Sequence, residues 1–275
     1  MTPIRVLIVA MAILVMSLQP GRADEKSFIL ATTTSTENSG LLDAIIPLFS
    51  KQTGIKVNVV AVGTGQALEL GRRGDAAALL THDRMGEQAF ITADHGTDRR
   101  DVMYNDFILI GPPGDPAGIT GSQSTSEAFA RLANSEIPFV SRGDDSGTHR
   151  KELRLWQQSG IDVSTFGKWY LEAGSGMGQT IITTMEIGGY TLADRATWSK
   201  FSGKNDYIIV FEQSPPLFNP YSSVLVTNAN LSHEKASYAK QWHEWITGSV
   251  GQQAIEDYRF KGQQLFFTGT PVSPG

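Results

Sequence analysis

The sequence predicts an α/β protein whose sheets are mainly parallel. Short β-branched or apolar runs alternate with stretches of helical spacing along nearly the whole chain, and Gly-rich turns join the two kinds of segment. The apolar runs predict strands at 27–32, 56–62, 76–82, 102–111, 137–141, 190–194, 207–212 and 222–228. Apolar residues near helical spacing predict helices at 41–52, 64–73, 85–94, 124–135, 146–160 and 177–188.

The first segment of the chain predicts a secretory signal peptide. One Arg precedes an uncharged apolar run at 6–18, and a Gln-Pro-Gly sequence and small residues follow it. This pattern is typical of a signal peptide at residues 1–23 that is cleaved near Ala23. A membrane anchor is the alternative, but the thirteen apolar residues of this run are short against the roughly 20 that span a bilayer.

Composition narrows the class of protein. The 275 residues include no cysteine, and removal of residues 1–23 would take the formal charge from −5 to −7. An acidic chain of this kind argues against a nucleic-acid partner, which favours a basic surface. Without cysteine there are no disulfides, no thiol chemistry and no lipid-bearing Cys after the signal peptide, which favours a soluble periplasmic protein. The remaining length suits one large domain or two of ordinary size.

Two Gly- and Pro-rich segments predict the domain organisation. They lie at 111–123, after a long strand candidate, and at 211–223. If both are crossings between lobes, residues 24–112 and 216–275 form lobe I and residues 113–215 form lobe II. Two ordinary surface loops are the alternative interpretation.

Four strand-to-helix junctions share one chemical character. They lie at 32–40, 62–68, 141–149 and 174–180, and each combines Gly with Ser or Thr ahead of a predicted helix. The first NH groups of a helix lack internal partners and its dipole favours negative charge, so such a junction can bind an anion. Each junction alone is also what ordinary helix capping looks like. Junctions at the carboxyl ends of parallel strands share one edge, so several can converge on one small ligand.

The third junction adds a fixed positive charge. Arg142 directly precedes the sequence Gly-Asp-Asp-Ser-Gly-Thr, so its guanidinium could meet the same anion as the NH groups of 146–148. An ion pair of Arg142 with Asp144 or Asp145 at the surface is the alternative.

Signals for catalysis are weak. His82, Asp83 and Glu87 are the nearest approach to a metal cluster, but they lack a partner at known ligand spacing. Ser146, His149 and Asp144 lie within six positions at a helix start, where a nucleophile, base and orienting acid do not easily align. We therefore predict no catalytic residues and no metal site.

Long collinear motifs carry a resemblance to a known family. They are ATTTSTENSGLLDAIIPLF, VVAVGTGQALELGRRGDAAALLTHDR, VMYNDFILIGPPGDPAGI, FVSRGDDSGTHRKE, GSGMGQT and YTLADRATW. With these motifs the sequence resembles the tungstate-binding proteins of ABC-type importers, within the two-lobed periplasmic oxyanion receptors. The resemblance implies a venus-flytrap fold with helices on both faces of the sheets, two crossovers between lobes and an anion held in the cleft. It also implies a monomer without a cofactor or chemistry of its own that delivers its anion to a permease and the permease's ATPase.

Matching the motifs residue by residue gives the expected oxyanion contacts. They are Thr33, Thr34, Ser35, Thr64, Gly65, Arg142, Ser146, Gly147 and Thr148. One departure from the family pattern is Thr81, where we expect an apolar residue before His82.

Tungstate is the expected ligand, with molybdate and phosphate as alternatives. Molybdate has nearly the size and charge of tungstate. Phosphate carries a proton at neutral pH and favours a buried carboxylate acceptor, which tungstate would disfavour. Asp144 and Asp145 therefore distinguish the two, according to whether either carboxylate faces the cleft. A hypothesis of another class is a periplasmic phosphate or sulfate ester hydrolase with Ser146 as its nucleophile.

Overall fold

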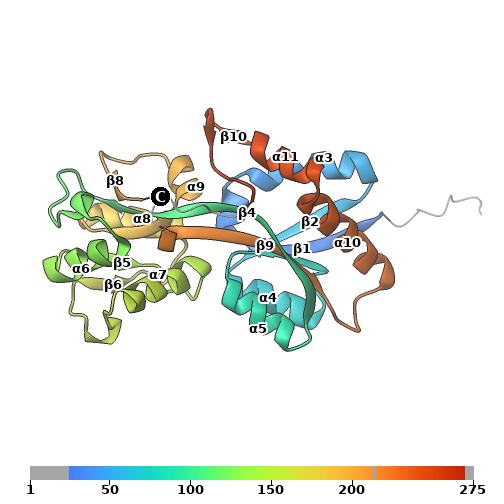
Figure 1. The fold of residues 1–275 in the computed structure, drawn as a ribbon, viewed down its shortest axis with the longest axis horizontal. Helices are drawn as coiled ribbons and strands as arrows, with labels where there is room; N and C mark the ends of the chain where they lie inside the picture. Colours follow the sequence, from blue (N-terminus) through green and yellow to red (C-terminus); the bar gives the residue numbers. More distant parts are fainter. Residues whose placement is uncertain (1–24, 213–214, 270–275) are drawn as a thin grey trace, which may run out of the picture.

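The protein has two lobes that lie side by side and are joined by two long strands (Figure 1). The structure is a computed structural model and describes residues 25–212 and 215–269. The predicted signal peptide and its cleavage near Ala23 lie outside the described residues. None of the helices in the described ranges is both long and apolar enough to cross a membrane.

The elements follow the predicted alternation of strand and helix. The strands are β1 (Ser27–Thr33), β2 (Lys56–Val62), β3 (Ala78–Thr81), β4 (Gly96–Gly111), β5 (Phe139–Ser141), β6 (Tyr170–Glu172), β7 (Thr191–Asp194), β8 (Ile208–Phe211), β9 (Phe218–Val226), β10 (Arg259–Phe260) and β11 (Gln263–Gln264). The α-helices are α2 (Thr34–Asn38), α3 (Leu41–Thr53), α4 (Thr64–Arg73), α5 (Arg84–Thr92), α6 (Thr125–Ser135), α7 (Gly147–Gln158), α8 (Met177–Glu186), α9 (Arg195–Lys200), α10 (His233–Thr247) and α11 (Ser249–Asp257). The 3₁₀ turns are η2 (Ile119–Gly121), η3 (Val163–Thr165) and η4 (Pro215–Leu217).

The main sheet has seven strands in the order β2-β1-β3-β9-β4-β7, with β8 also paired to β4. β1 pairs in parallel with β2 and β3, and β5 pairs in parallel with β6 in a small separate sheet. β9 is antiparallel to β3 and β4, and β7 and β8 are antiparallel to β4. The main sheet is therefore mixed and not mainly parallel as expected, because β4 and β9 run between the lobes in opposite directions.

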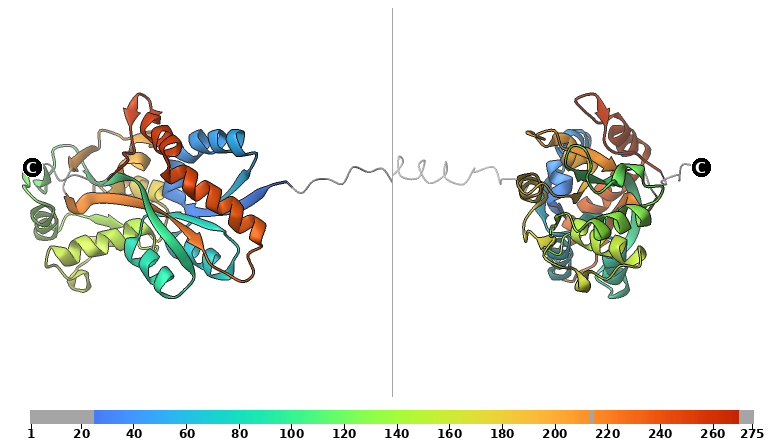
Figure 2. Two further views of the ribbon diagram at one scale, coloured as in Figure 1. Left: turned by 45° about the vertical axis from the view of Figure 1, so that its right-hand side comes forward. Right: turned by 90° about the vertical axis from the view of Figure 1, so that its left-hand side faces the viewer.

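Helices cover both faces of the sheet in the first lobe. Along β1, Phe28 and Leu30 pack with Leu41, Trp242 and other residues of α3, α10 and α11, while Ala31 packs with residues of α4 and α5. These two groups of helices lie on opposite sides of the sheet (Figures 1 and 2). A strand buried on both faces has apolar residues in succession, which explains the continuous apolar run at the start of β1.

The second lobe repeats this arrangement on β4. Phe107 and Leu109 pack with residues of α6 and α7, whereas Ile108 and Ile110 pack with residues of α8 and α9. The fully buried Trp156 of α7 meets Phe129 edge to face, at 4.5 Å between ring centroids. This alternation along β4 gives the lobe one apolar core on each face of the strand.

A buried carboxyl group lies in the first of these cores. Glu152 of α7 accepts hydrogen bonds from Trp156 Nε1 at 2.9 Å and from the Tyr170 hydroxyl at 2.8 Å. Burial raises the pKa of the Glu152 carboxyl to about 7, and the hydrogen bonds oppose that effect only in part.

β4 and β9 connect the lobes. Val102 and Met103 of β4 pack in the core of the first lobe, while its residues from Phe107 onward pack in the second. On the way back, Leu217 packs in the second lobe and Tyr221 of β9 in the first. The chain therefore crosses between the lobes twice, inside paired strands.

Candidate functional site

A small cavity lies where strands of both lobes end and helices begin. The volume not occupied by protein atoms, including the part open to solvent, is about 170 Å³. A space of this size suits a ligand of few atoms. Its lining residues are Thr33, Thr34, Ser35, Val62, Gly63, Thr64, His82, Arg142, Ser146, Gly147 and Thr148.

The fold brings three of the four predicted junctions to this cavity. β1 leads into α2, β2 leads into α4, and β5 leads through Arg142 into α7. Since β1 and β2 are parallel and in register up to Thr33 and Val62, their carboxyl ends lie at the same edge of the sheet. The β5–α7 junction reaches the cavity from the other lobe. Eight of the nine expected contact residues line the cavity, and Gly65 does not.

Two of the lining hydroxyl groups cap the helices that they precede. Thr33 Oγ1 accepts from Thr36 N at 3.3 Å at the start of α2. Ser146 Oγ accepts from His149 N at 3.2 Å at the start of α7. For these residues, helix capping does not exclude a role at the cavity, because the same hydroxyl group caps the helix and lines the cavity.

Several polar atoms of the lining have no protein partner. Among the described residues, Thr64 Oγ1, Thr148 Oγ1 and Arg142 Nε are buried without a hydrogen bond. A buried polar group without a partner costs about 1–3 kcal/mol, so three around one cavity indicate a ligand rich in acceptors. These atoms come from both lobes, so a ligand that satisfied all three would lie between the lobes.

Arg142 is the fixed positive charge at the cavity. Its side chain is 5% exposed, and Nη2 donates to Asp144 Oδ2 at 2.5 Å. The other oxygen of Asp144 accepts from Ser146 N at 3.2 Å. Asp145 pairs with Arg150, and neither acid is among the lining residues. Asp144 therefore orients Arg142 from behind, while the Nε group of Arg142 stays available.

Gly147 allows a close approach between the lobes. A Cβ atom at Gly147 would lie 2.7 Å from His82 Cε1 and 3.0 Å from Thr64 Oγ1. Both distances are shorter than ordinary van der Waals contacts, so only glycine fits here. The backbone at the start of α7 thus forms one wall of the cavity against side chains of the first lobe.

The nine expected contacts did not include His82, Val62 or Gly63, although Val62 and Gly63 lie in the second predicted junction. His82 follows β3, which pairs in parallel with β1, so it reaches the same edge as Thr33. The available signal was its place at the end of a predicted strand, but strand order is not visible in one sequence. His82 Nε2 lies 3.4 Å from Ser35 Oγ, and its Nδ1 lies 2.9 Å from Asn219 Oδ1.

A buried carboxylate fixes the turn that carries His82. Glu87 Oε1 accepts from Thr81 Oγ1 at 2.8 Å and from Asp83 N at 3.0 Å, and its other oxygen pairs with Arg99 Nε at 2.8 Å. Thr81, the departure from the family pattern, is fully buried and supplies one of these bonds. The hydroxyl group at position 81 is therefore part of the support for the turn.

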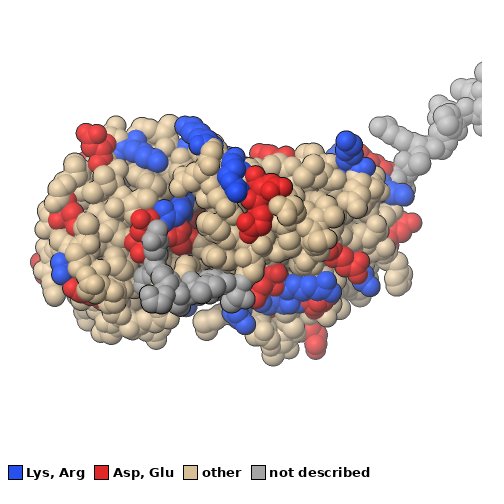
Figure 3. Space-filling model, turned by 45° about the horizontal axis from the view of Figure 1, so that its top comes forward, with Lys and Arg blue, Asp and Glu red and all other residues tan. Residues whose placement is uncertain are grey.

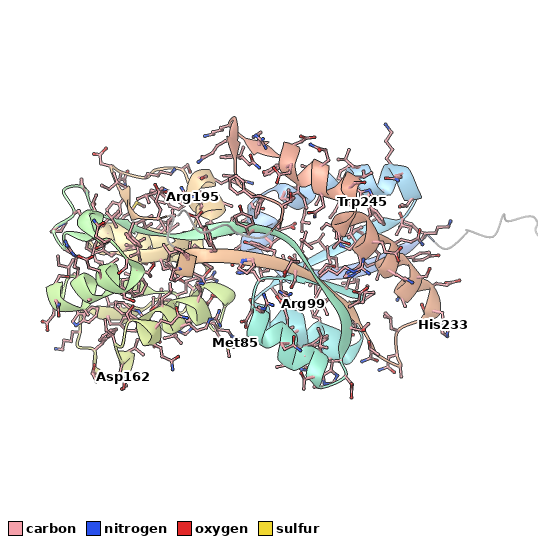
Figure 4. All side chains as sticks on the ribbon, viewed as in Figure 1. Met85, Arg99, Asp162, Arg195, His233 and Trp245 are labelled. Atoms are coloured by element: carbon pink, nitrogen blue, oxygen red, sulfur yellow. The ribbon has the colours of Figure 1, made fainter. Side chains whose placement is uncertain are left out.

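Ion pairs hold the lobes together beside the cavity. Asp83 accepts from Arg150 Nη1 at 2.9 Å and from Arg154 Nη1 at 3.2 Å, and both arginines lie on α7. Gly65 lies at the same interface, since a Cβ there would be 3.2 Å from Arg150 Nη2. In Figure 4, Met85 lies on the side of α5 nearest α7, and its side chain is exposed. The lobes are thus in contact and close the cavity.

The fourth predicted junction lies beside the site. Ser175 N donates to Arg142 O at 3.3 Å, but no residue of 174–180 lines the cavity. This junction therefore supports the backbone that carries Arg142.

Comparison with known proteins agrees with this geometry. Residues 19–250 match the PBP superfamily domain. The tungstate-binding protein TupA of Peptoclostridium acidaminophilum is 44% identical over 234 residues, which cover 84% of this chain and 81% of the relative. The chain belongs to the TupA family of the PBP superfamily. Two solved structures are also similar, namely the tungstate ABC transporter protein of Geobacter sulfurreducens and TupA of Desulfovibrio alaskensis G20. The first is 45% identical with a TM-score of 0.78 and covers 85% of this chain and 99% of that one. The second is 40% identical with a TM-score of 0.79 and covers 89% and 99%.

In this TupA-family protein, His149 is not placed as a base for Ser146. His149 Nδ1 accepts from Asp145 N at 3.0 Å, so that ring nitrogen is not a base for the Ser146 hydroxyl. Across residues 25–212 and 215–269, no group of three His, Asp or Glu side chains could hold a metal ion. On the face of the protein in Figure 3, acidic and basic side chains are interspersed and form no extended basic patch.

Proposed function

We propose that the protein captures tungstate between its lobes and delivers it to an ABC permease. The observation that carries this proposal is the set of unpartnered buried polar atoms on Thr64, Arg142 and Thr148, which surround a cavity of a few atoms' size. The tungstate-binding names of the similar proteins support the same ligand. Eight of the nine residues expected from the sequence remain the proposed contacts. His82 is added to them, and Gly65 is assigned to the interface between the lobes.

Closure is part of the proposed mechanism. Donors from the first lobe at Thr64 and from the second at Arg142 and Thr148 are all satisfied only when the lobes meet around the anion. A ligand that binds the closed form better shifts the population toward it. The ion pairs of Asp83 with Arg150 and Arg154 form only in that arrangement and add to its stability.

The carboxylate positions favour a fully deprotonated anion. Asp144 and Asp145 are engaged by Arg142 and Arg150 and lie outside the cavity lining. Hydrogen phosphate would therefore lack a carboxylate acceptor for its proton, which disfavours phosphate. Molybdate is the second candidate ligand, because its size and charge match those of tungstate.

Location and partners follow from the same proposal. We place the mature protein in the periplasm after cleavage near Ala23, as a soluble monomer without a cofactor. Its partners are a permease and the permease's cytoplasmic ATPase. We assign residues 24–112 and 216–275 to lobe I and 113–215 to lobe II. The packing of residues near β4 and β9 supports crossings close to these boundaries, at 103–107 and 217–221.

Calorimetric titration tests the proposal. The mature protein is titrated with tungstate, molybdate, sulfate and phosphate, and the Kd of each is compared. Tight binding of tungstate with weak or absent binding of phosphate is expected. Tight binding of phosphate without tungstate would refute the proposal. Turnover of generic phosphate or sulfate esters that is lost in Ser146→Ala would instead support the hydrolase.

A further inference from the structure

His82 is the titratable side chain among the lining residues that is not paired with a charge. Its side chain is buried, and its ring packs on Tyr221 with 4.8 Å between centroids. Nδ1 faces Asn219 Oδ1 at 2.9 Å, and Nε2 faces Ser35 Oγ at 3.4 Å beside the cavity. The ring is therefore held in one orientation, with one nitrogen toward the protein and the other toward the ligand side.

The neighbours of Asn219 fix the tautomer of His82. Asn219 Nδ2 donates to Asn105 Oδ1 at 2.8 Å and to the Tyr221 hydroxyl at 3.1 Å. The amide oxygen of Asn219 is thus the atom that faces His82, and it accepts from Nδ1–H. A neutral His82 then carries a bare lone pair on Nε2, on the side of the cavity.

Hydrogen-bond counting shows a conflict when a deprotonated oxyanion enters. Such an anion offers only acceptors. The hydroxyl of Ser35, which also lies 3.0 Å from Thr33 Oγ1, has one hydrogen to share among its neighbours. If Ser35 donates to the anion, its oxygen faces the lone pair of His82 Nε2. If Ser35 donates to His82, it presents only lone pairs to the anion. A proton on Nε2 removes the conflict, because His82 then donates to Ser35 and Ser35 donates to the anion.

Before an anion enters, the charges around His82 act in opposite directions. Asp83 favours a charged ring, whereas Arg142 and Arg154 oppose it, and burial dominates and lowers the His82 pKa to about 4. In this closed arrangement without an anion, His82 is therefore neutral near pH 7. Arg142 is already paired with Asp144, so it neutralises a dianion only in part. Two negative charges beside the ring favour its protonated form.

We propose that His82 takes up one proton from solvent when the oxyanion binds, so that imidazolium and guanidinium together face the two negative charges. This inference rests on the proposed function of the cavity. It makes His82 a determinant of affinity and of its pH dependence.

Calorimetry in buffers of different ionisation enthalpy measures the proton count. Wild-type protein is titrated with tungstate at pH 6.5 in two such buffers. Uptake close to one proton per anion is expected, with an affinity that weakens by up to about tenfold per pH unit as the pH rises. Wild-type binding without proton uptake would refute the inference alone. Absence of tungstate binding would refute the proposed function as well.

Two variants locate the proton. His82→Gln retains an NH donor at the cavity but cannot take up a proton, so uptake should vanish and the affinity should lose its pH dependence. His149→Gln is the matched control, since His149 lies at the start of α7 outside the lining, and uptake should persist. Uptake that persists in His82→Gln would place the proton on the anion or another group and overturn the assignment.

If His82→Gln no longer binds tungstate, NMR spectroscopy of the wild-type protein still tests the inference. NMR of wild-type protein with ¹⁵N-labelled histidine reports the protonation of each ring. Addition of tungstate should convert His82 from the Nδ1–H form to imidazolium at pH 6.5. A ring that stays neutral in the saturated complex would refute the inference.

Discussion

Replacement of Gly147 by Ala tests whether the lobes must meet closely around the ligand. The new methyl group would lie 2.7 Å from His82 Cε1 and 3.0 Å from Thr64 Oγ1. His82 cannot turn aside without breaking its bond to Asn219 and its packing on Tyr221. The second lobe must therefore shift away from the first by several tenths of an ångström.

This shift raises the free energy of the closed form. Overpacking of this kind costs about 1–3 kcal/mol, and each 1.4 kcal/mol changes affinity about tenfold. Gly147→Ala should therefore weaken tungstate binding by about 5- to 150-fold. The stability of the second lobe by itself should be unchanged, because Gly147, the first residue of α7, does not have a positive φ and Ala can adopt its backbone conformation.

Calorimetry and thermal unfolding separate the two effects. Gly147→Ala should lose affinity while the melting temperature of the ligand-free protein stays equal. Gly178→Ala is the control, because Gly178 occupies the first turn of α8 and a Cβ there has no atom within 4 Å. Wild-type affinity in Gly147→Ala would show that the lobes do not approach this closely in the complex.

Three further changes give distinct outcomes. Arg142→Ala removes a charged donor worth about 1.5–3 kcal/mol and should raise the Kd for tungstate at least tenfold by calorimetry, whereas an unchanged Kd would leave Arg142 only a structural ion pair. Asp83→Asn weakens the ion pairs to Arg150 and Arg154, which are partly exposed. The binding free energy for tungstate should fall by about 1 kcal/mol, which raises the Kd about fivefold, while the melting temperature of the ligand-free protein stays the same. A lowered melting temperature would contradict a role confined to closure. Burial holds the pKa of Glu152 at about 7, above its ordinary value of 4.5. Between these two pH values the native state keeps a proton that the unfolded state loses. The free energy of unfolding should therefore fall as the pH rises from 4.5 to 7. Glu152→Gln should remove about 3 kcal/mol of this pH dependence in denaturant unfolding at pH 5 and 8, and equal slopes in both proteins would refute it.

The chemical character of the site was visible in the sequence. Hydroxyl and glycine residues at Thr33 to Ser35, at Thr64 and at Ser146 to Thr148 mark strand-to-helix junctions, and the structure places them around one cavity. Local sequence shows these residues because capping and anion contact need the same groups at the same helix starts. Whether each contacts an oxyanion stays a prediction.

Long-range pairing was not visible. His82 reaches the cavity because β3 lies between β1 and β9, and one sequence does not show that order. For the same reason the antiparallel pairs of β4 and β9 were not expected. Alternating strands and helices usually indicate parallel sheets, but a chain that leaves a lobe and returns must run in both directions.

The ribbon formed by β4 and β9 determines which relative motion of the lobes is easy. Its ladder runs from the pair Gly96 and Val226 to the pair Asp106 and Phe218. Sliding one lobe along the ribbon would break ladder hydrogen bonds along its length, whereas flexing the ribbon out of its plane preserves them. The two lobes should therefore open by rotation about a single hinge axis. Release of the ligand should then depend on one angle between the lobes, which a docked permease can change.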